Sequence, residues 1–162
     1  MFSAELKEYV TGERPHNHQK TMDFKLHQLS GSNLTSIFNN AYIEAETVKD
    51  TEFCAINGER HMLLIAYSEH NILQYQNWVY FGKDFTEEDA NRFSKAINEK
   101  MIMLKAYVSN TEDGEICLAI KYNHVILEHE SISGKTLVKL TRMVERHLLF
   151  TNQIYDEMFL KR

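Results

Sequence analysis

The chain has 162 residues, of which 43% are hydrophobic and 11% aromatic. A chain of this length buries roughly 70% of the surface that its unfolded form exposes, so one domain can fold without a disulfide or a metal. The formal net charge is −5, from 18 basic and 23 acidic residues. Dedicated nucleic-acid binders carry clustered lysine and arginine instead. We therefore expect one globular domain whose main partner is not a nucleic acid.

Membrane and export signals are absent from the sequence as given. It contains no run of about eighteen apolar residues, and its first residues lack the basic start and apolar core of a signal peptide. These observations predict a soluble, cytoplasmic protein with no membrane partner. Cys54 and Cys117 lie in strand-like segments, where we expect free, buried thiols.

Residues 1–33 predict an N-terminal extension, a short helix followed by a linker, before a single domain at 34–162. Four apolar residues fit one helical stripe in this extension: Phe2, Leu6, Tyr9 and Val10. A polar run over 12–20 ends that pattern. His16 and His18 lie in the run without a third ligand nearby, so we expect solvated loop residues and no metal site.

The first helix and hairpin of the domain follow. A helix is expected after Gly31 and Ser32, because Leu34 begins an apolar stripe and serine caps helix starts. Asn57-Gly58 then separates the strand-like runs 52–56 and 59–67, and this dipeptide predicts a tight two-residue hairpin. Such a turn would pair Cys54 with His61 across the two strands.

A third strand is predicted at 72–81, after a turn at 68–71. It contains four aromatic residues: Tyr75, Trp78, Tyr80 and Phe81. Core packing is the favoured use of these side chains, and a peptide-binding surface is the alternative. Stacking on nucleic-acid bases is disfavoured because no basic residue interleaves with them in this strand.

The second half of the domain repeats the helix-then-hairpin pattern. Thr86 and the three acidic residues after it predict a capping box and a helix to about Lys100. A hairpin over 101–122 turns at Asp113-Gly114, and an extended run at 125–127 follows. The last helix should begin near Ser133 or Gly134 and end near residue 160.

The last helix is apolar over a wider arc than a one-sided surface helix needs. Beside its central apolar stripe lies a second ridge formed by Met143, Phe150 and Ile154. The ridge belongs either to the core or to an interface with a partner or a second copy. We take six residues as the candidate partner or dimer interface: Met143, His147, Phe150, Ile154, Trp78 and Tyr80.

The chain holds no recognisable catalytic, cofactor or metal constellation. Ser133-Gly-Lys-Thr136 lacks the earlier glycine of a phosphate-binding loop, because His129 occupies that position. Cys54 and His61 alone close neither a zinc site nor a nucleophile and base pair. The carboxylates at 87–89 fan around a helix axis, and His124 and His129 are isolated. We therefore expect a protein that is not an enzyme and binds no cofactor.

Four features of the domain form a family pattern: Asn98, the Lys-Ala-Tyr run at 105–107, Asp113-Gly114 and the long final helix. Through them, the segment from Leu34 to the C-terminus resembles the YbjN family of bacterial proteins, which share a type III secretion chaperone-like fold. The resemblance implies an α+β fold with an antiparallel sheet packed by helices, in the order α-β-β-β-α-β-β(-β)-α. The family is labelled a sensory transduction regulator and has no established catalytic residues, and the related secretion chaperones are small acidic homodimers that hold extended partner segments.

Composition and resemblance together predict a non-enzymatic regulatory or chaperone-like protein-binding module, and a homodimer. The alternative is a small-ligand binder or enzyme that uses a pocket between sheet and helices, lined by Trp78 and the histidines. A concave cavity with convergent polar groups would favour the alternative, whereas a solid apolar core would exclude it.

Overall fold

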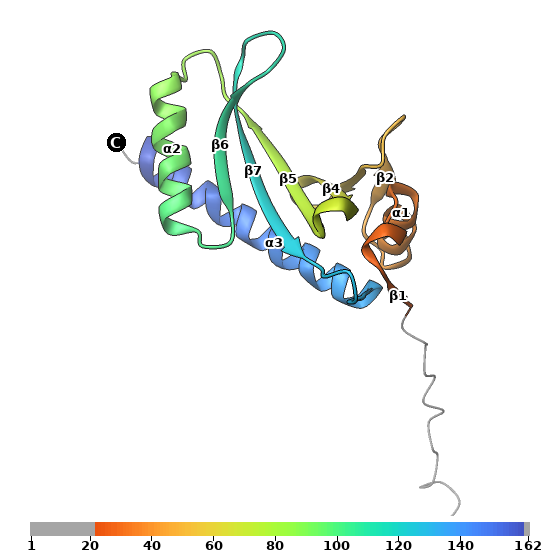
Figure 1. Ribbon diagram of the computed structural model, residues 1–162. Coiled ribbons are helices and arrows are strands. Elements are labelled where there is room, and N and C mark those ends of the chain that lie inside the picture. The colour runs from red at the N-terminus through yellow and green to blue at the C-terminus, as the bar shows by residue number, and fades with distance from the viewer. Residues whose placement is uncertain (1–21, 161–162) are drawn as a thin grey trace, which may run out of the picture.

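The structure is a computed structural model, and it describes residues 22–160 (Figure 1). Its helices are α1 (Gly31–Asn40), α2 (Glu87–Lys100) and α3 (Gly134–Tyr155), and α3 continues into a π-helical turn (Asp156–Leu160). Its strands are β1 (Asp23–Phe24), β2 (Ala45–Thr47), β3 (Cys54–Asn57), β4 (His61–Tyr67), β5 (Ile72–Tyr80), β6 (Lys105–Asn110), β7 (Ile116–Val125) and β8 (Ile132–Ser133). Short 3₁₀ turns occupy Leu26–Gln28 and Ser68–His70.

Six strands form one antiparallel sheet in the order β2-β3-β4-β5-β7-β6. The predicted α+β class is confirmed, with helices packed on an antiparallel sheet. Some details differ from the expectation. Strands β1, β2 and β8 were not predicted, and β1 pairs with β8. The extended run at 125–127 is no separate strand, because Val125 ends β7.

The three helices enclose one core on a single face of the sheet. Helix α3 crosses behind the strands, α2 lies beside the β6 edge and α1 lies beside β2 (Figure 1). Side chains alternate between the faces of a strand, so every second residue enters the core. The core contains these fully buried residues from sheet and helices: Leu34, Phe38, Ile56, Met62, Leu64, Leu73, Tyr75, Ile97, Leu118, Ile120 and Leu137.

Local signals set the helix starts. Thr86 caps α2 and exchanges bonds with Asp89 in a capping box, and Ser133 accepts a hydrogen bond from the Thr136 N–H at 3.1 Å. The predicted capping box of α2 and the predicted start of α3 are confirmed. The cap of helix α1, however, lies two residues earlier than predicted. Ser30, and not Ser32, caps the helix by accepting a hydrogen bond from the Asn33 N–H.

The predicted register of the first hairpin is wrong. Cys54 pairs with Leu64, not with His61, because residues 58–60 form the turn and Asn57 pairs with His61. A two-residue turn would place buried Cys54 opposite the exposed His61, whereas the observed register pairs Cys54 with Leu64 and Ile56 with Met62, which all belong to the core cluster.

A carboxylate from a distant helix shapes this turn. Glu145 of α3, only 7% exposed, accepts a hydrogen bond from the Glu59 N–H at 2.7 Å and one from the Arg60 N–H at 3.5 Å. A Cβ atom at Gly58 would lie 2.0 Å from Glu145 Oε1, so glycine lets the backbone approach the carboxylate. The turn therefore depends on a residue more than eighty positions away.

The chain before α1 contributes to the same core. Strand β1 pairs with β8, and Leu26 and Leu29 are 6% and 2% exposed within the core cluster. The compact part therefore includes residues that the predicted boundary at 33–34 assigns to the extension. The predicted helix near Phe2 and the histidines at 16 and 18 lie outside the described residues.

On each edge strand of the sheet, an asparagine from a neighbouring helix binds the backbone of one residue. Asn98 of α2 donates to the Ala106 carbonyl at 2.9 Å and accepts from the Ala106 N–H at 2.8 Å on edge strand β6. At the opposite edge, Asn39 of α1 makes the same pair of bonds with Ala45 on β2, each at 3.0 Å. An edge strand with free backbone groups invites pairing with another chain, and at Ala106 and Ala45 these amides occupy those groups.

A buried hydroxyl pair links the sheet to α3. Tyr75 Oη and Thr141 Oγ1 lie 2.9 Å apart, and both residues are at most 2% exposed. Burial raises the pKa of the Tyr75 phenol far above its ordinary value, while the bond to Thr141 acts in the opposite direction. The phenol is therefore a neutral hydrogen-bonding group at physiological pH.

We expect Tyr75→Phe to lower the free energy of unfolding by about 1–2 kcal/mol, because it leaves the Thr141 hydroxyl buried without its partner. Thr141→Val alone should have a similar effect. The double variant should lose less free energy of unfolding than the two single variants lose together, since both polar groups are then removed. Urea denaturation of the four proteins measures this coupling, and additive losses would contradict it.

Candidate functional site

Among residues 22–160, no helix lies in front of the second face of the sheet. Figure 1 views this face, on which β5, β7 and β6 lie in front of α3. The side chains that point to this face are Ile72, Gln74, Gln76, Trp78 and Tyr80 on β5, Cys117, Ala119, Lys121, Asn123 and Val125 on β7, and Lys105, Tyr107 and Ser109 on β6. We call this set the open face.

An aromatic row crosses the middle of the open face. The register places Trp78 opposite Ala119, and Ala119 opposite Tyr107, so two rings flank a methyl group. Trp78 and Tyr107 are 37% and 54% exposed, whereas Ala119 is 4% exposed although it lies outside the core cluster. Tyr80 extends the aromatic surface on β5 and is 63% exposed.

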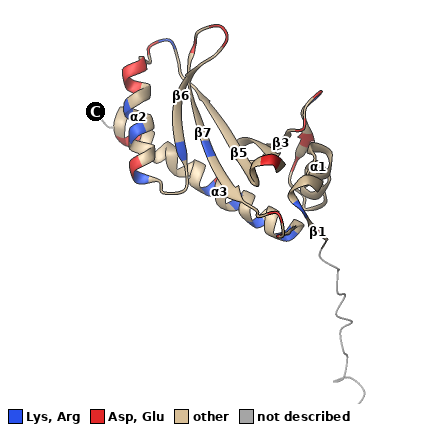
Figure 2. Ribbon diagram, in the orientation of Figure 1, with Lys and Arg blue, Asp and Glu red and all other residues tan. Residues whose placement is uncertain are grey.

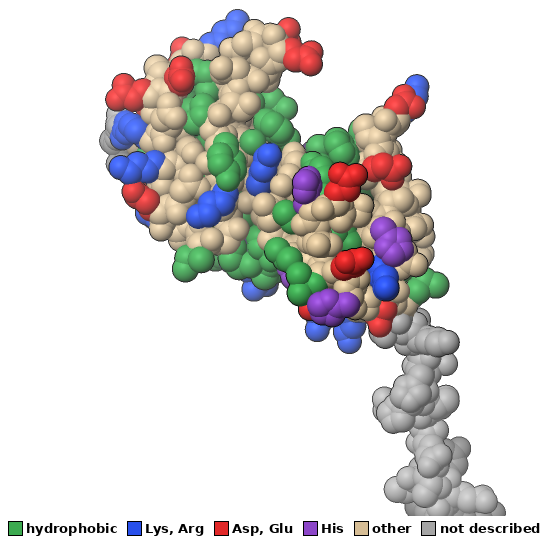
Figure 3. Space-filling view, viewed as in Figure 1, with side chains coloured by type: hydrophobic (Ala, Val, Ile, Leu, Met, Phe, Trp, Pro, Cys, Tyr) green, Lys and Arg blue, Asp and Glu red, His purple; other side chains and the backbone are tan. Residues whose placement is uncertain are grey.

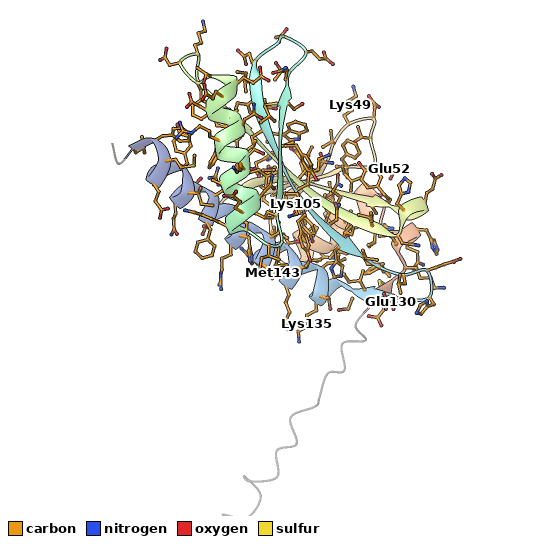
Figure 4. The ribbon with its side chains drawn as sticks, turned by 60° about the vertical axis from the view of Figure 1, so that its left-hand side comes forward. Lys49, Glu52, Lys105, Glu130, Lys135 and Met143 are labelled. Atoms are coloured by element: carbon orange, nitrogen blue, oxygen red, sulfur yellow. The ribbon has the colours of Figure 1, made fainter. Side chains whose placement is uncertain are left out.

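A lysine pair lies in the adjacent row. Lys105 of β6 is directly opposite Lys121 of β7, which in turn is opposite Gln76 of β5. Directly opposed residues on one face of an antiparallel pair have Cβ atoms about 5 Å apart, and like charges there repel each other. Figure 4 labels Lys105 on the front of the sheet.

Amide side chains occupy the positions beside the lysine pair and in the next row away from the aromatic row. Gln74 donates to Asn123 Oδ1 at 2.7 Å across β5 and β7, and Gln76 donates to Gln74 along β5. These bonds fix the orientation of the amides beside the lysine pair.

No acidic residue occupies an outward position on β5, β7 or β6. Figure 2 shows acidic residues instead at the β6–β7 turn and at the connection between β4 and β5, while one lysine lies on each of β6 and β7. In the space-filling view of the same face, apolar and basic side chains adjoin over β6 and β7 (Figure 3). The open face is thus locally basic in an acidic chain.

The six predicted interface residues fall into two groups that the fold separates. Trp78 and Tyr80 share the open face, whereas the other four belong to α3 behind the sheet. Within α3, Phe150 is 43% exposed, and Met143 and His147 are half-buried, with His147 Nδ1 bonded to the Met143 carbonyl at 2.8 Å. These three positions stay a predicted interface.

Ile154 does not belong to an exposed ridge. It is 5% exposed and lies within the core cluster, so its expected place on an interface of the folded chain is wrong. Helix α3 is apolar over a wide arc because the end of the helix also packs against α2: Phe93 of α2 contacts Tyr155 and Phe159, with ring centroids 5.5 and 6.1 Å apart. Intrachain packing thus explains part of the arc.

Sequence reasoning missed Tyr107, Lys105 and Lys121 as members of this site. The alternation of exposed and buried residues along β6 and β7 could have assigned each residue to a face. The pairing of β5 with β7 could not be inferred, because α2 and β6 lie between them in the chain.

The cysteine and histidine combinations provide no catalytic pair. Burial raises the pKa of the Cys54 thiol, a hydrogen bond from the Thr35 hydroxyl opposes this shift, and the raised pKa keeps the thiol protonated at neutral pH. His61 instead bonds Asn57 Oδ1 through Nδ1 at 2.7 Å. Among residues 22–160, no group of three or more His, Cys, Asp or Glu residues could hold a metal ion.

The alternative prediction placed a pocket between sheet and helices, and core side chains pack together in that space. A concave region of about 580 Å³ lies elsewhere, beside the end of β7 and the loop before β8. Its lining includes His124, His129, Glu130 and Asp23, but not Trp78. Trp78 and these histidines therefore do not form the ligand pocket of the alternative prediction.

In the described part of the chain, no helix combines the length and the hydropathy that crossing a bilayer requires.

Comparisons with known proteins identify the fold. No protein-family model and no curated protein matches the chain. Among solved structures, it is similar to the crystal structure of YbjN from E. coli, a proposed transcription regulator, with a TM-score of 0.58 and 8% sequence identity. The match covers 74% of this chain and 86% of that one. At this identity the likeness concerns the fold, and it confirms the resemblance inferred from the sequence: the chain has a YbjN-like fold.

Proposed function

We propose that this chain is a non-enzymatic, cytoplasmic regulatory or chaperone-like module that binds a segment of a partner protein on the open face of its sheet. The observation that carries this proposal is the aromatic row, in which Trp78 and Tyr107 remain exposed on a face that none of the helices within residues 22–160 covers. Tryptophan and tyrosine are enriched among the residues that contribute most to protein interfaces.

The asparagine bonds on the two edge strands support binding across the face. A partner strand that paired along the full length of β6 or β2 would compete with Asn98 for Ala106 or with Asn39 for Ala45. A partner lying on the open face needs no free edge, because it binds through side chains and buries the aromatic row. The geometry therefore favours a segment laid over β5, β7 and β6.

The test is a selection from a library of displayed random peptides against the full chain, with Trp78→Ala and Tyr107→Ala as variants. We expect selected peptides to bind each variant at least tenfold more weakly, since each change removes one ring of the row. The matched control is Phe150→Ala, which removes an exposed ring on α3 and should leave binding within about twofold. Equal binding to all variants, or loss only with Phe150→Ala, would refute the open face as the binding surface.

Trp78 also gives a direct signal, since it is the single tryptophan of the chain. A segment that covers the aromatic row should shift its fluorescence emission to shorter wavelength, because the indole leaves water. Binding without any change in emission would place the peptide elsewhere.

A further inference from the structure

We propose that the open face recognises an extended acidic segment of its partner, in which a carboxylate side chain lies between Lys105 and Lys121 and an apolar side chain two positions away packs on Trp78 and Tyr107. This inference rests on the proposed function and specifies its ligand. It follows from the charges, the register and the surroundings of the open face.

The lysine pair of the open face carries two positive charges without a carboxylate partner among the described residues. Lys105 and Lys121 are directly opposed on one face, and neither takes part in an ion pair among the described residues. Two opposed ammonium groups repel each other, and a carboxylate between them removes the repulsion while forming two charge-assisted hydrogen bonds.

The distance between the lysine row and the aromatic row matches the repeat of an extended chain. The lysine row and the aromatic row are two residues apart along each strand: Lys121 and Ala119 on β7, and Lys105 and Tyr107 on β6. Two residues of an extended chain span roughly 6.6 Å, and side chains at i and i+2 point to the same side. A partner segment running along the strands therefore presents an acidic residue to the lysines and an apolar residue to the rings when the two are separated by one position.

The surroundings favour a protein segment over a nucleic acid. The chain carries a net charge of −5, and acidic residues lie at the β6–β7 turn beyond the aromatic row: Glu112, Asp113 and Glu115. A phosphate backbone carries a charge at every nucleotide and would meet these carboxylates, and its binders use many basic residues. A peptide with one or two carboxylates satisfies Lys105 and Lys121 without approaching the acidic turn.

The experiment uses the full chain and synthetic nine-residue peptides with a glycine and serine background. The test peptide carries Glu and Phe at positions i and i+2. Control peptides replace Glu by Gln, replace Glu by Lys, or move Phe to i+1. Binding is followed by Trp78 fluorescence and by calorimetry at low and high salt, and a single-stranded oligothymidylate serves as the nucleic-acid probe.

We expect the Glu peptide to bind at least tenfold more tightly than the Gln peptide and the i+1 peptide, and to weaken at high salt. A Lys105→Glu, Lys121→Glu double variant should lose the Glu peptide and gain the Lys peptide. The matched control, Lys135→Glu with Lys139→Glu on α3, should bind the Glu peptide as the native protein does. Thermal unfolding of both double variants should match the native protein, which separates lost binding from lost folding.

Three outcomes would overturn this inference. The Glu and Gln peptides could bind equally, the oligothymidylate could compete more strongly than the Glu peptide, or the charge reversal could change the sedimentation of the protein and so identify a second copy as the occupant. The inference and the proposed function fail separately. If selected peptides need Trp78 but ignore the lysines, the open face remains the binding surface and only its acidic ligand is refuted.

Discussion

Replacing Ile154 by alanine is expected to lower the free energy of unfolding by about 2–5 kcal/mol, because the side chain is 5% exposed within the core cluster and its removal leaves a cavity under the end of α3. The two ends of α3 pack against different parts of the molecule, and Ile154 lies near the end that also contacts α2. Urea or guanidinium denaturation, followed by circular dichroism, measures this loss.

Phe150→Ala is the matched control on the same helix. Its ring is 43% exposed, so its removal should cost about 1 kcal/mol or less. Sedimentation of both variants addresses the predicted homodimer, which Phe150, Met143 and His147 could still form. If Ile154→Ala kept the native unfolding free energy but dissociated an oligomer, the side chain would belong to an interface and not to the core.

Replacing Asn98 by alanine is expected to cost about 1–3 kcal/mol, the second largest effect we anticipate. The change removes two hydrogen bonds to Ala106, which is 2% exposed, and leaves its N–H without a partner on the edge of the sheet. The Ala106 carbonyl keeps a bond from the Ser94 hydroxyl at 2.8 Å, so the N–H accounts for most of the cost. The unfolding free energy and the hydrogen exchange of the Ala106 amide report on this edge.

Two further substitutions sharpen the test. Asn91→Ala on the same helix removes only an exposed bond to the Glu87 carbonyl, so we expect little change. Asn98→Asp keeps an acceptor for the Ala106 N–H but turns a carboxylate toward the Ala106 carbonyl. Its free energy of unfolding should therefore lie between those of the native protein and Asn98→Ala. Equal stability of the native protein and Asn98→Ala would show that the edge needs no side-chain partner.

The sequence predicted those features that neighbouring residues decide. The starts of α2 and α3 followed from Thr86 and Ser133, whose side chains bond backbone groups three positions ahead. The turn at Asp113-Gly114 followed from glycine, which adopts the positive φ of 79° found at Gly114. Alternation and periodicity predicted most of the individual helices and strands, and the resemblance to the YbjN family supplied the α+β class.

The candidate site was only partly accessible to the same reasoning. Trp78 and Tyr80 were recognised as possible binding residues because the aromatic side chains of a strand pack either in the core or on a peptide-binding surface. The structure divides that strand: Tyr75 is 1% exposed in the core, while Trp78 and Tyr80 lie on the open face. Alternation along β5 separates the two sets, but it does not say which face the helices cover.

By itself, the sequence determined the order of most elements, the starts of α2 and α3, the absence of a recognisable catalytic motif and the acidic balance of the chain. These features depend on composition and on contacts within a few residues. Only the tertiary structure decided the register of the first hairpin, where Glu145 binds the Glu59 N–H, and the burial of Ile154. It also decided the open face, where Trp78, Lys105 and Lys121 come from three strands whose pairing spans a helix. Such features arise from packing between segments distant in the chain, and the free energy of that packing is not encoded in any local pattern.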